Sequence, residues 1–476
     1  MKKINASALL LFALVCSFTA FGQTPKPLPR LRVSENGRFF VTESGQPFFW
    51  LGDTAWLLFE KLDRAEADQY LADRARKEFN ITLAQILPWE HGGTNVYGET
   101  AFVNKDFTQP NEKYWQHADY VIDRAAARGL YVGMLPMWCR NYIERRKEQP
   151  LIDAAAAYSY GKFLGARYRQ RSHLVWLLGG DDPPTKHEVY DAMAKGITDG
   201  AGRDVLMSYH PPSTVISTAA FYADKPWMDF NLFQSGHREV WFSYQNAAAD
   251  YARTPVKPTL ESEPNYENHP IKHKMENGVF NAWHVRSRVY WSVFAGGAGV
   301  TYGGNGVWQM DKAGQPPFLA THANLSWDKA LDLPGATQMK YLRRLIESRP
   351  FLSRVPDDGA ALASPAGENR TRVQVTRDAN RSWALYYISD GHAITPALPH
   401  LKGPQLKAWW FNPRDGRLYD NAGKATGKPF GTFANSGKGV VFKPPVTVSA
   451  ALEESDWVLV LDNAASNFPP PGQRKP

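Results

Sequence analysis

Short, almost continuous apolar runs alternate with longer amphipathic segments between residues 48 and 350. Runs that stay apolar on both faces are typical of parallel strands buried between helices. The intervening segments carry helical periodicity, and Asp63 is a possible N-cap of a helix predicted over 64–78. The apolar runs begin at Phe48, Ile81, Tyr131, Leu174, Val205, Met228, Lys257 and Gly296. Eight such strand–helix units predict a (β/α)8 TIM barrel, an α/β fold.

The pattern is different on either side of these units. Residues 31–47 predict a small hairpin with its turn at 35–37, so the barrel with its hairpin spans 23–350. After Pro350 the apolar runs become short and β-rich, with turn signals between them, which predicts an all-β sandwich domain over 351–462. The last residues, 463–476, contain three consecutive prolines and are predicted to be a disordered tail.

The first 22 residues have the pattern of a signal peptide. Lys2 and Lys3 precede an apolar run that is too short for a comfortable membrane span, and Ala20-Phe21-Gly22 supplies small residues at the cleavage positions. We therefore expect cleavage before Gln23 and export to the periplasm or beyond the cell. No later segment has the composition of a transmembrane helix.

The chain is rich in aromatic residues, with 16 Trp, 21 Tyr and 25 Phe. Sugar C–H faces stack on aromatic rings, so this content favours a carbohydrate substrate, although rings that fill a large core would give the same composition. The net charge of +8 is spread along the chain, so nucleic acid is not an expected partner. Without the leader, Cys139 is the one remaining cysteine, which excludes an intramolecular disulfide. The histidines lack metal-site spacing, and we expect a monomer with no metal and no other cofactor.

In a (β/α)8 barrel, the active site lies at the carboxyl ends of the strands. The fourth predicted strand ends in Asp181 and Asp182, and the seventh in Glu261 and Glu263. These strands face each other across the barrel mouth, which is the arrangement that glycoside hydrolysis needs. Adjacent Asp181 and Asp182 should diverge, whereas Glu261 and Glu263 should share a face, with Glu263 nearer the exit. The predicted substrate contacts at the other strand ends are Asp53, Trp89, Trp138, Asp182, His210, Gln234, His237, Tyr302 and Trp308, although Asp182 could instead stabilise the turn before Pro183.

Several stretches resemble the apiosidase-like glycosidases of glycoside hydrolase family 140. They include "FFWLGDTAW", "VWLLGGDDPP", "FQSGH", "PTLESEPNYEN", "VYWSVFAGGAGVTYGGNGVWQ" and "KAWWFNPRDG". The resemblance implies a retaining enzyme that acts on pectin side chains, typically on apiose in rhamnogalacturonan II. It assigns the acid/base role to Asp181 and the nucleophile role to Glu263. The common motif of the wider clan has Asn-Glu where this chain has Gly-Gly-Asp. The C-terminal domain resembles one that is labelled collagen-binding, for which we expect a structural or glycan-contacting role.

Two alternatives remain open. The first is another pectin-side-chain glycosidase, such as an arabinofuranosidase, which would need the same carboxylates. The second is a glycan-binding protein that does not cleave its ligand and so needs no catalytic carboxylate pair. Geometry distinguishes the mechanisms, because the two carboxyl groups lie about 5–5.5 Å apart in retaining enzymes and about 6.5–9.5 Å apart in inverting ones.

Overall fold

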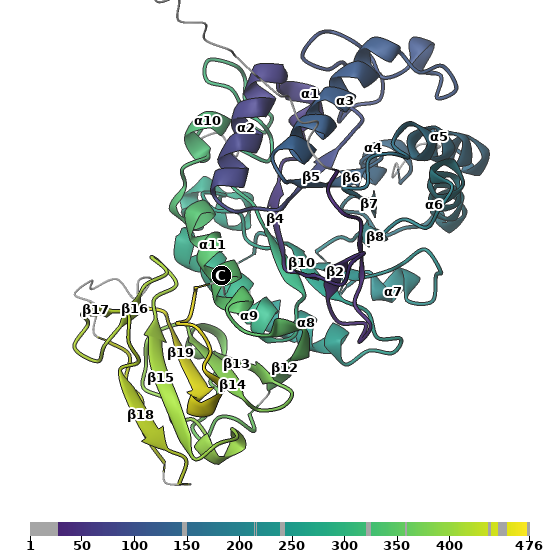
Figure 1. Ribbon diagram of the computed structural model, residues 1–476. Coiled ribbons are helices and arrows are strands. Elements are labelled where there is room, and N and C mark those ends of the chain that lie inside the picture. Colours follow the sequence, from purple (N-terminus) through teal and green to yellow (C-terminus); the bar gives the residue numbers. More distant parts are fainter. Residues whose placement is uncertain are drawn as a thin grey trace, which may run out of the picture.

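The computed structural model describes residues 27–144, 150–213, 215, 217–238, 243–319, 325–357, 359–436, 439–445 and 455–473. Figure 1 shows a barrel joined to a smaller β-sheet domain, with helices α9 and α11 lying between them. The predicted signal peptide lies outside the described residues. Within the described residues, no helix is both long enough and apolar enough to cross a membrane.

Eight parallel strands form the predicted barrel. They pair in the order β8-β7-β6-β5-β4-β11-β10-β9, and a backbone hydrogen bond of 2.9 Å from Asp229 N to Met207 O lies between the two ends of this series. Every residue of these strands is buried, which explains their nearly continuous apolar sequence. The strands are β4 (Trp50–Thr54), β5 (Ile81–Gln85), β6 (Tyr131–Leu135), β7 (Leu174–Gly179), β8 (Met207–His210), β9 (Asn231–Gln234), β10 (Thr259–Glu263) and β11 (Gly299–Tyr302).

Helices follow the barrel strands. Asp63 caps α2 as predicted, in a capping box with Glu66. In the described residues between β8 and β9, the short α7 is the one helix. Helices α5 and α6 pack closely, since a Cβ on Gly165 would lie 2.1 Å from Ile197 O. The helices are α1 (Leu58–Lys61), α2 (Arg64–Arg76), α3 (Glu112–Ala127), α4 (Cys139–Tyr142), α5 (Ala154–Arg167), α6 (His187–Ala201), α7 (Ala219–Tyr222), α8 (Ser243–Tyr251), α9 (Ala282–Phe294), α10 (Trp327–Ala330) and α11 (Pro334–Glu347). Short 3-10 turns are η1 (Val103–Lys105), η2 (Ile271–His273), η3 (Met275–Asn277), η5 (Phe351–Ser353), η6 (Asn369–Thr371), η7 (Leu398–His400) and η9 (Ala464–Ser466).

A small antiparallel sheet precedes the barrel. Its strands are β1 (Leu31–Val33), β2 (Phe40–Thr42) and β3 (Pro47–Phe48), and the predicted turn is closed by a 2.8 Å hydrogen bond from Gly37 N to Ser34 O. Phe40 of this sheet packs edge-on against Phe230, just before β9. The hairpin therefore packs against the amino ends of the barrel strands, away from the carboxyl ends where the site is expected.

The C-terminal part forms an antiparallel sandwich, as predicted. Its strands pair in the order β12-β13-β14-β19-β15-β16-β17, with β18 beside β15. They are β12 (Arg354–Asp357), β13 (Val373–Asp378), β14 (Trp383–Ile388), β15 (Gln405–Phe411), β16 (Leu418–Tyr419), β17 (Ala425–Thr426), β18 (Gly431–Ala434) and β19 (Trp457–Asn463). A separate apolar core, which includes the buried Trp410 and Trp457, explains why this segment has its own β-rich pattern.

Buried ion pairs join the sandwich to the barrel helices. Arg286 of α9 contacts Asp456 at 2.9 Å, and Arg349 after α11 contacts Asp462 at 2.7 Å. Arg349 also donates to Pro469 O at 2.9 Å and lies over the ring of Phe468. The prediction of a disordered tail is therefore wrong for residues 463–473. A buried arginine needs acceptors, and this segment supplies one of them.

Candidate active site

The carboxyl ends of β7, β8, β9 and β10 bring five polar side chains together. We call Asp181, His210, Gln234, His237 and Glu263 the mouth cluster. His210 Nε2 lies 3.3 Å from Glu263 Oε2 and 3.6 Å from Asp181 Oδ1, and His237 Nε2 lies 3.2 Å from Glu263 Oε1. A carboxylate oxygen of Asp181 and one of Glu263 lie within 4.8 Å of each other. The two strand ends that the sequence singled out thus meet at one point.

A β-bulge in β10 aims Glu263 into this cluster. Glu261 pairs with Phe233 of β9, but Glu263 pairs with its next neighbour Gln234, so Ser262 is the extra residue. Since successive residues of β9 point to opposite faces, Glu261 and Glu263 do so too. The prediction that they share a face is therefore wrong. Phe233 packs outward against α8 and Ala295, which follows α9, and Glu261 accordingly lies near Ser292 and Arg288 of α9.

Asp181 and Asp182 diverge, as predicted, but by a different route. Asp181 is in the left-handed backbone region, with φ of 63°, and its Oδ1 accepts a hydrogen bond of 2.7 Å from Gln234 Nε2. Asp182 turns away and pairs with Arg140 at 2.8 Å. The side chain of Asp181 remains 31% exposed, whereas that of Asp182 is only 7% exposed. Asp181 is therefore the aspartate that a substrate in the barrel mouth can reach.

The imidazoles determine the charge of the mouth cluster. Burial by itself raises the pKa of Glu263, but the imidazoles of His210 and His237 outweigh it and hold that pKa well below its usual range. Burial by itself lowers the pKa of His210, but Asp181 and Glu263 raise it to about 9. Glu263 is therefore ionised and His210 protonated at neutral pH. By contrast, burial raises the pKa of Glu261 to about 7, against the opposing effects of Ser235, Ser292 and Arg288.

A continuous series of aromatic rings runs from His210 round to His237. Trp56 contacts His210 at a centroid distance of 5.0 Å and Trp138 at 5.1 Å, and Trp138 contacts Trp89 at 5.1 Å. The series continues through Phe318 (5.2 Å from Trp89), Trp308 (5.7 Å from Phe318) and Tyr266 (6.4 Å from Trp308, 4.5 Å from His237). Three predicted contacts, Trp89, Trp138 and Trp308, thus belong to this series, which we call the aromatic wall, and Trp138 and Trp308 are buried in it, 2% and 8% exposed. Their contact with a sugar stays a prediction.

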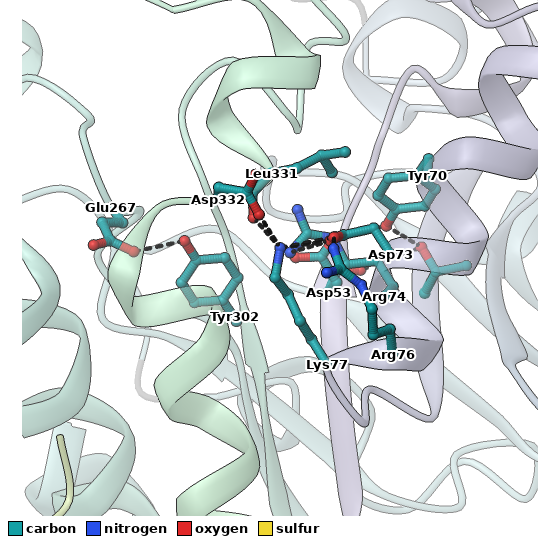
Figure 2. Close-up of polar contacts among 11 residues, drawn as sticks. Asp53, Tyr70, Asp73, Arg74, Arg76, Lys77, Glu267, Tyr302, Leu331 and Asp332 are labelled. Carbon is teal, nitrogen blue, oxygen red and sulfur yellow. Dashed lines mark hydrogen bonds and ion pairs between the residues drawn. The ribbon is translucent and has the colours of Figure 1, made fainter. Parts of the chain in front are cut away.

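Besides Asp182, which pairs with Arg140, two predicted substrate contacts lie in neither the mouth cluster nor the aromatic series beside it. Asp53 is fully buried, where it accepts a 2.6 Å hydrogen bond from Tyr70 and pairs with Arg74 at 3.1 Å. Tyr302 is also fully buried and donates to Glu267 at 2.7 Å (Figure 2). The proposed sugar contacts of Asp53 and Tyr302 are therefore not supported. Both residues lie at the ends of barrel strands, as predicted, but adjoining helices and loops bury their side chains.

Sequence reasoning missed Tyr266 and Phe318. Tyr266 stands three residues after Glu263, and the charge of Glu263 raises the pKa of the tyrosine well above its usual value, after the larger effect of burial. Its place in the stretch "ESEPNYE" was the available signal. Phe318 lies in the loop after β11, where neither periodicity nor spacing distinguishes a wall residue from any other loop aromatic.

One group among the described residues has the closeness of metal ligands. Donor atoms of Asp181, His210 and Glu263 all lie within 4.8 Å of one another. The hydrogen bond from Gln234 and the contact with His237 already engage two of the carboxylate oxygens. The same closeness of two carboxylates is what a glycosidase requires.

Comparisons with known proteins identify the families that the two domains resemble. Residues 34–353 match the family model "Apiosidase-like, catalytic domain", and residues 355–462 match the model "Putative collagen-binding domain of a collagenase". A solved glycoside hydrolase has 32% sequence identity and a TM-score of 0.82, with 92% of this chain and 97% of that chain covered. A glycoside hydrolase family 5 structure from Bacteroides vulgatus has 33% identity and a TM-score of 0.82, with 93% and 96% covered. No curated protein matches the chain.

Proposed function

The chain belongs to the apiosidase-like glycoside hydrolases, and from this premise we propose that it is an exported, retaining glycosidase of plant pectin side chains. The first substrate to consider is apiose on rhamnogalacturonan II, because the family model that matches the barrel is apiosidase-like. The observation that carries the mechanism is the approach of Asp181 and Glu263 to within 4.8 Å. This closeness supports retention, since inverting enzymes separate the two groups by about 6.5–9.5 Å to admit a water molecule.

The proposed reaction has two steps. In the first, the Asp181 carboxyl protonates the glycosidic oxygen while a Glu263 oxygen attacks the anomeric carbon, so that the glycosidic bond breaks and a glycosyl ester forms. In the second, Asp181 takes a proton from water, the water oxygen bonds to the anomeric carbon, and Glu263 leaves as a carboxylate. The different exposure of the two groups suits these roles. Asp181 is partly open to a leaving group and water, while Glu263 is buried and held ionised by His210 and His237.

Aryl glycosides of apiose, arabinose, galactose and rhamnose test this proposal. We expect release of the apiosyl group, with the first-formed sugar detected by NMR in the anomeric configuration of the substrate. Inversion would contradict the mechanism, and cleavage of the arabinoside alone would replace the sugar. Failure to release any sugar from these probes and from pectic oligosaccharides would favour a glycan-binding protein.

The proposed export has its own test, the N-terminal sequence of the protein recovered outside the cytoplasm. We expect that chain to begin at Gln23, and a chain that keeps Met1 would contradict export through a cleaved signal peptide.

A further inference from the structure

The backbone that carries Asp181 is an unusual turn. Gly179, Gly180 and Asp181 have φ values of 94°, 130° and 63°, so three consecutive residues adopt conformations that favour glycine. Side chains could not replace these glycines, since a Cβ on Gly180 would lie 2.9 Å from the Trp138 ring. Asp181 itself is not a glycine, and a residue in the left-handed region persists only where its surroundings hold it.

Side chains from neighbouring elements hold this turn by its carbonyl groups. Cys139 Sγ donates to Gly180 O at 3.0 Å, Arg140 Nη2 contacts Asp181 O at 3.4 Å, and Tyr209 Oη donates to Asp182 O at 2.8 Å. Arg140 also grips the Asp182 carboxylate with two hydrogen bonds, of 2.8 Å from Nε and 3.2 Å from Nη2. Of these three donors, Arg140 contacts two consecutive residues of the turn: the backbone carbonyl of Asp181 and the side-chain carboxylate of Asp182.

On the other side, Gln234 fixes the orientation of the Asp181 carboxylate. Its amide nitrogen contacts Asp181 Oδ1, Pro211 O and, at 3.0 Å, His210 Nε2. Because the protonated imidazole cannot accept, the two amide hydrogens go to the two oxygens, and the amide oxygen faces away from them. Oδ1 is therefore occupied by a donor. The proton that goes to a leaving group must then be carried by Oδ2, and the turn decides where Oδ2 points.

We propose that Arg140 is a positioning residue for the acid/base, which holds the left-handed turn so that Asp181 presents Oδ2 to the glycosidic oxygen. This inference rests on the proposed function. A purely structural role predicts a different result, because the Asp182 carboxylate is only 7% exposed and loss of its partner would lower stability without any dependence on the leaving group. Direct binding of an anionic substrate by Arg140 is a separate possibility, and the test below distinguishes it.

The test uses two apiosides, with 4-methoxyphenol and 2,4-dinitrophenol as leaving groups, or the same pair on whichever sugar the wild-type enzyme cleaves. The first leaving group needs protonation and the second does not, so kcat/KM of the first depends on Asp181. We expect Arg140→Met to lower kcat/KM for the methoxyphenyl substrate by about tenfold to a hundredfold, and for the dinitrophenyl substrate by less than about threefold. Arg140→Lys should lie in between. Asp182→Asn should reproduce the pattern, and the double variant Arg140→Met/Asp182→Asn should add little to it.

Arg171→Met is the matched control, because Arg171 grips Asp123 with an equivalent pair of bonds, of 2.7 Å and 3.0 Å, on the outside of the barrel. It should leave both substrates unaffected. Equal losses on both leaving groups, or none, would overturn the inference while leaving the proposed function intact. A normal rate on both, with a raised KM only for uronate-bearing pectin fragments, would overturn it in favour of substrate binding. A wild-type enzyme that cleaves no aryl glycoside would overturn the proposed function and this inference together.

Discussion

Two groups of charged side chains adjoin the barrel strands, and they differ in the cations that face their carboxylates. In the mouth cluster, Asp181 and Glu263 face two histidines and an amide. In the second group, Asp53, Tyr70, Asp73, Arg74 and Lys77, which we call the closed cluster, the carboxylates face arginine and lysine (Figure 2). Asp53 and Arg74 have fully buried side chains, and the side chains of Asp73 and Lys77 are 6% exposed.

The difference matters because histidine can release its proton near neutral pH and arginine cannot. A change of charge on Glu263 or Asp181 during turnover can be met by a proton moving on or off an imidazole. A change of charge on Asp53 would leave Arg74 as a buried cation with its nearest partner gone. Burial raises the pKa of Asp53 to about 6, although Arg74 and Tyr70 lower it. The closed cluster is thus suited to holding α2 against β4, and the mouth cluster to changing its charge.

The largest expected effect is that of Glu263→Gln on turnover. Without the nucleophile, kcat should fall by about four orders of magnitude. The unfolding free energy should change by less than about 2 kcal/mol, because His210 can lose its proton when its counter-charge is removed. Initial rates and a denaturant titration measure the two effects. Activity within tenfold of wild type would remove Glu263 from the nucleophile role.

The second expected effect is a loss of stability with little loss of activity. Asp53→Asn in the closed cluster is the variant matched to Glu263→Gln in the mouth cluster. Removal of one charge from a buried pair leaves the other uncompensated, so we expect a loss of about 3 kcal/mol of unfolding free energy, with kcat/KM within about tenfold of wild type. The shift of the denaturant midpoint measures the loss. If Asp53→Asn lost activity and kept its stability, the distinction between the two clusters would be wrong.

The smallest effect is in the pH dependence of stability. The folded pKa of His210 is about 9, above its ordinary value of 6.5, so its contribution is complete below about pH 6.5 and is lost as pH rises through about 9. The pKa of Glu263 is lowered, so its contribution is complete above its ordinary value of 4.5 and is lost as pH falls from there towards the lower folded pKa. The difference in unfolding free energy between wild type and His210→Gln should therefore be largest near pH 5–6.5 and fall by about 2–3 kcal/mol towards pH 10.

Denaturant titrations across this pH range measure that difference. Arg74→Met, taken through the same series, is the control from the closed cluster, because arginine does not titrate in this range and its difference from wild type should not fall with rising pH in the same way. A pH-independent difference for His210→Gln would show that the imidazole carries no extra proton in the fold.

Much of the fold could be read from the sequence, and the errors have local causes. The eight buried strands, the cap at Asp63 and the sandwich follow from apolar runs, turn residues and capping chemistry, all of which act over a few residues. The prediction of a disordered tail fails for residues 463–473 because their order depends on Arg349, more than a hundred residues earlier in the chain. Strand alternation predicts one face for Glu261 and Glu263 only where pairing is regular, and the bulge at Ser262 breaks that regularity.

The sequence by itself determined which strand ends carry carboxylates, and so which residues could form a glycosidase pair. The tertiary structure decided what each carboxylate faces. It enclosed Asp53 with Arg74, turned Asp182 onto Arg140, and left Asp181 and Glu263 facing histidines across the barrel mouth. The physical reason is that the charge of a buried carboxylate depends on partners from other strands and helices, which no local pattern along the chain can specify.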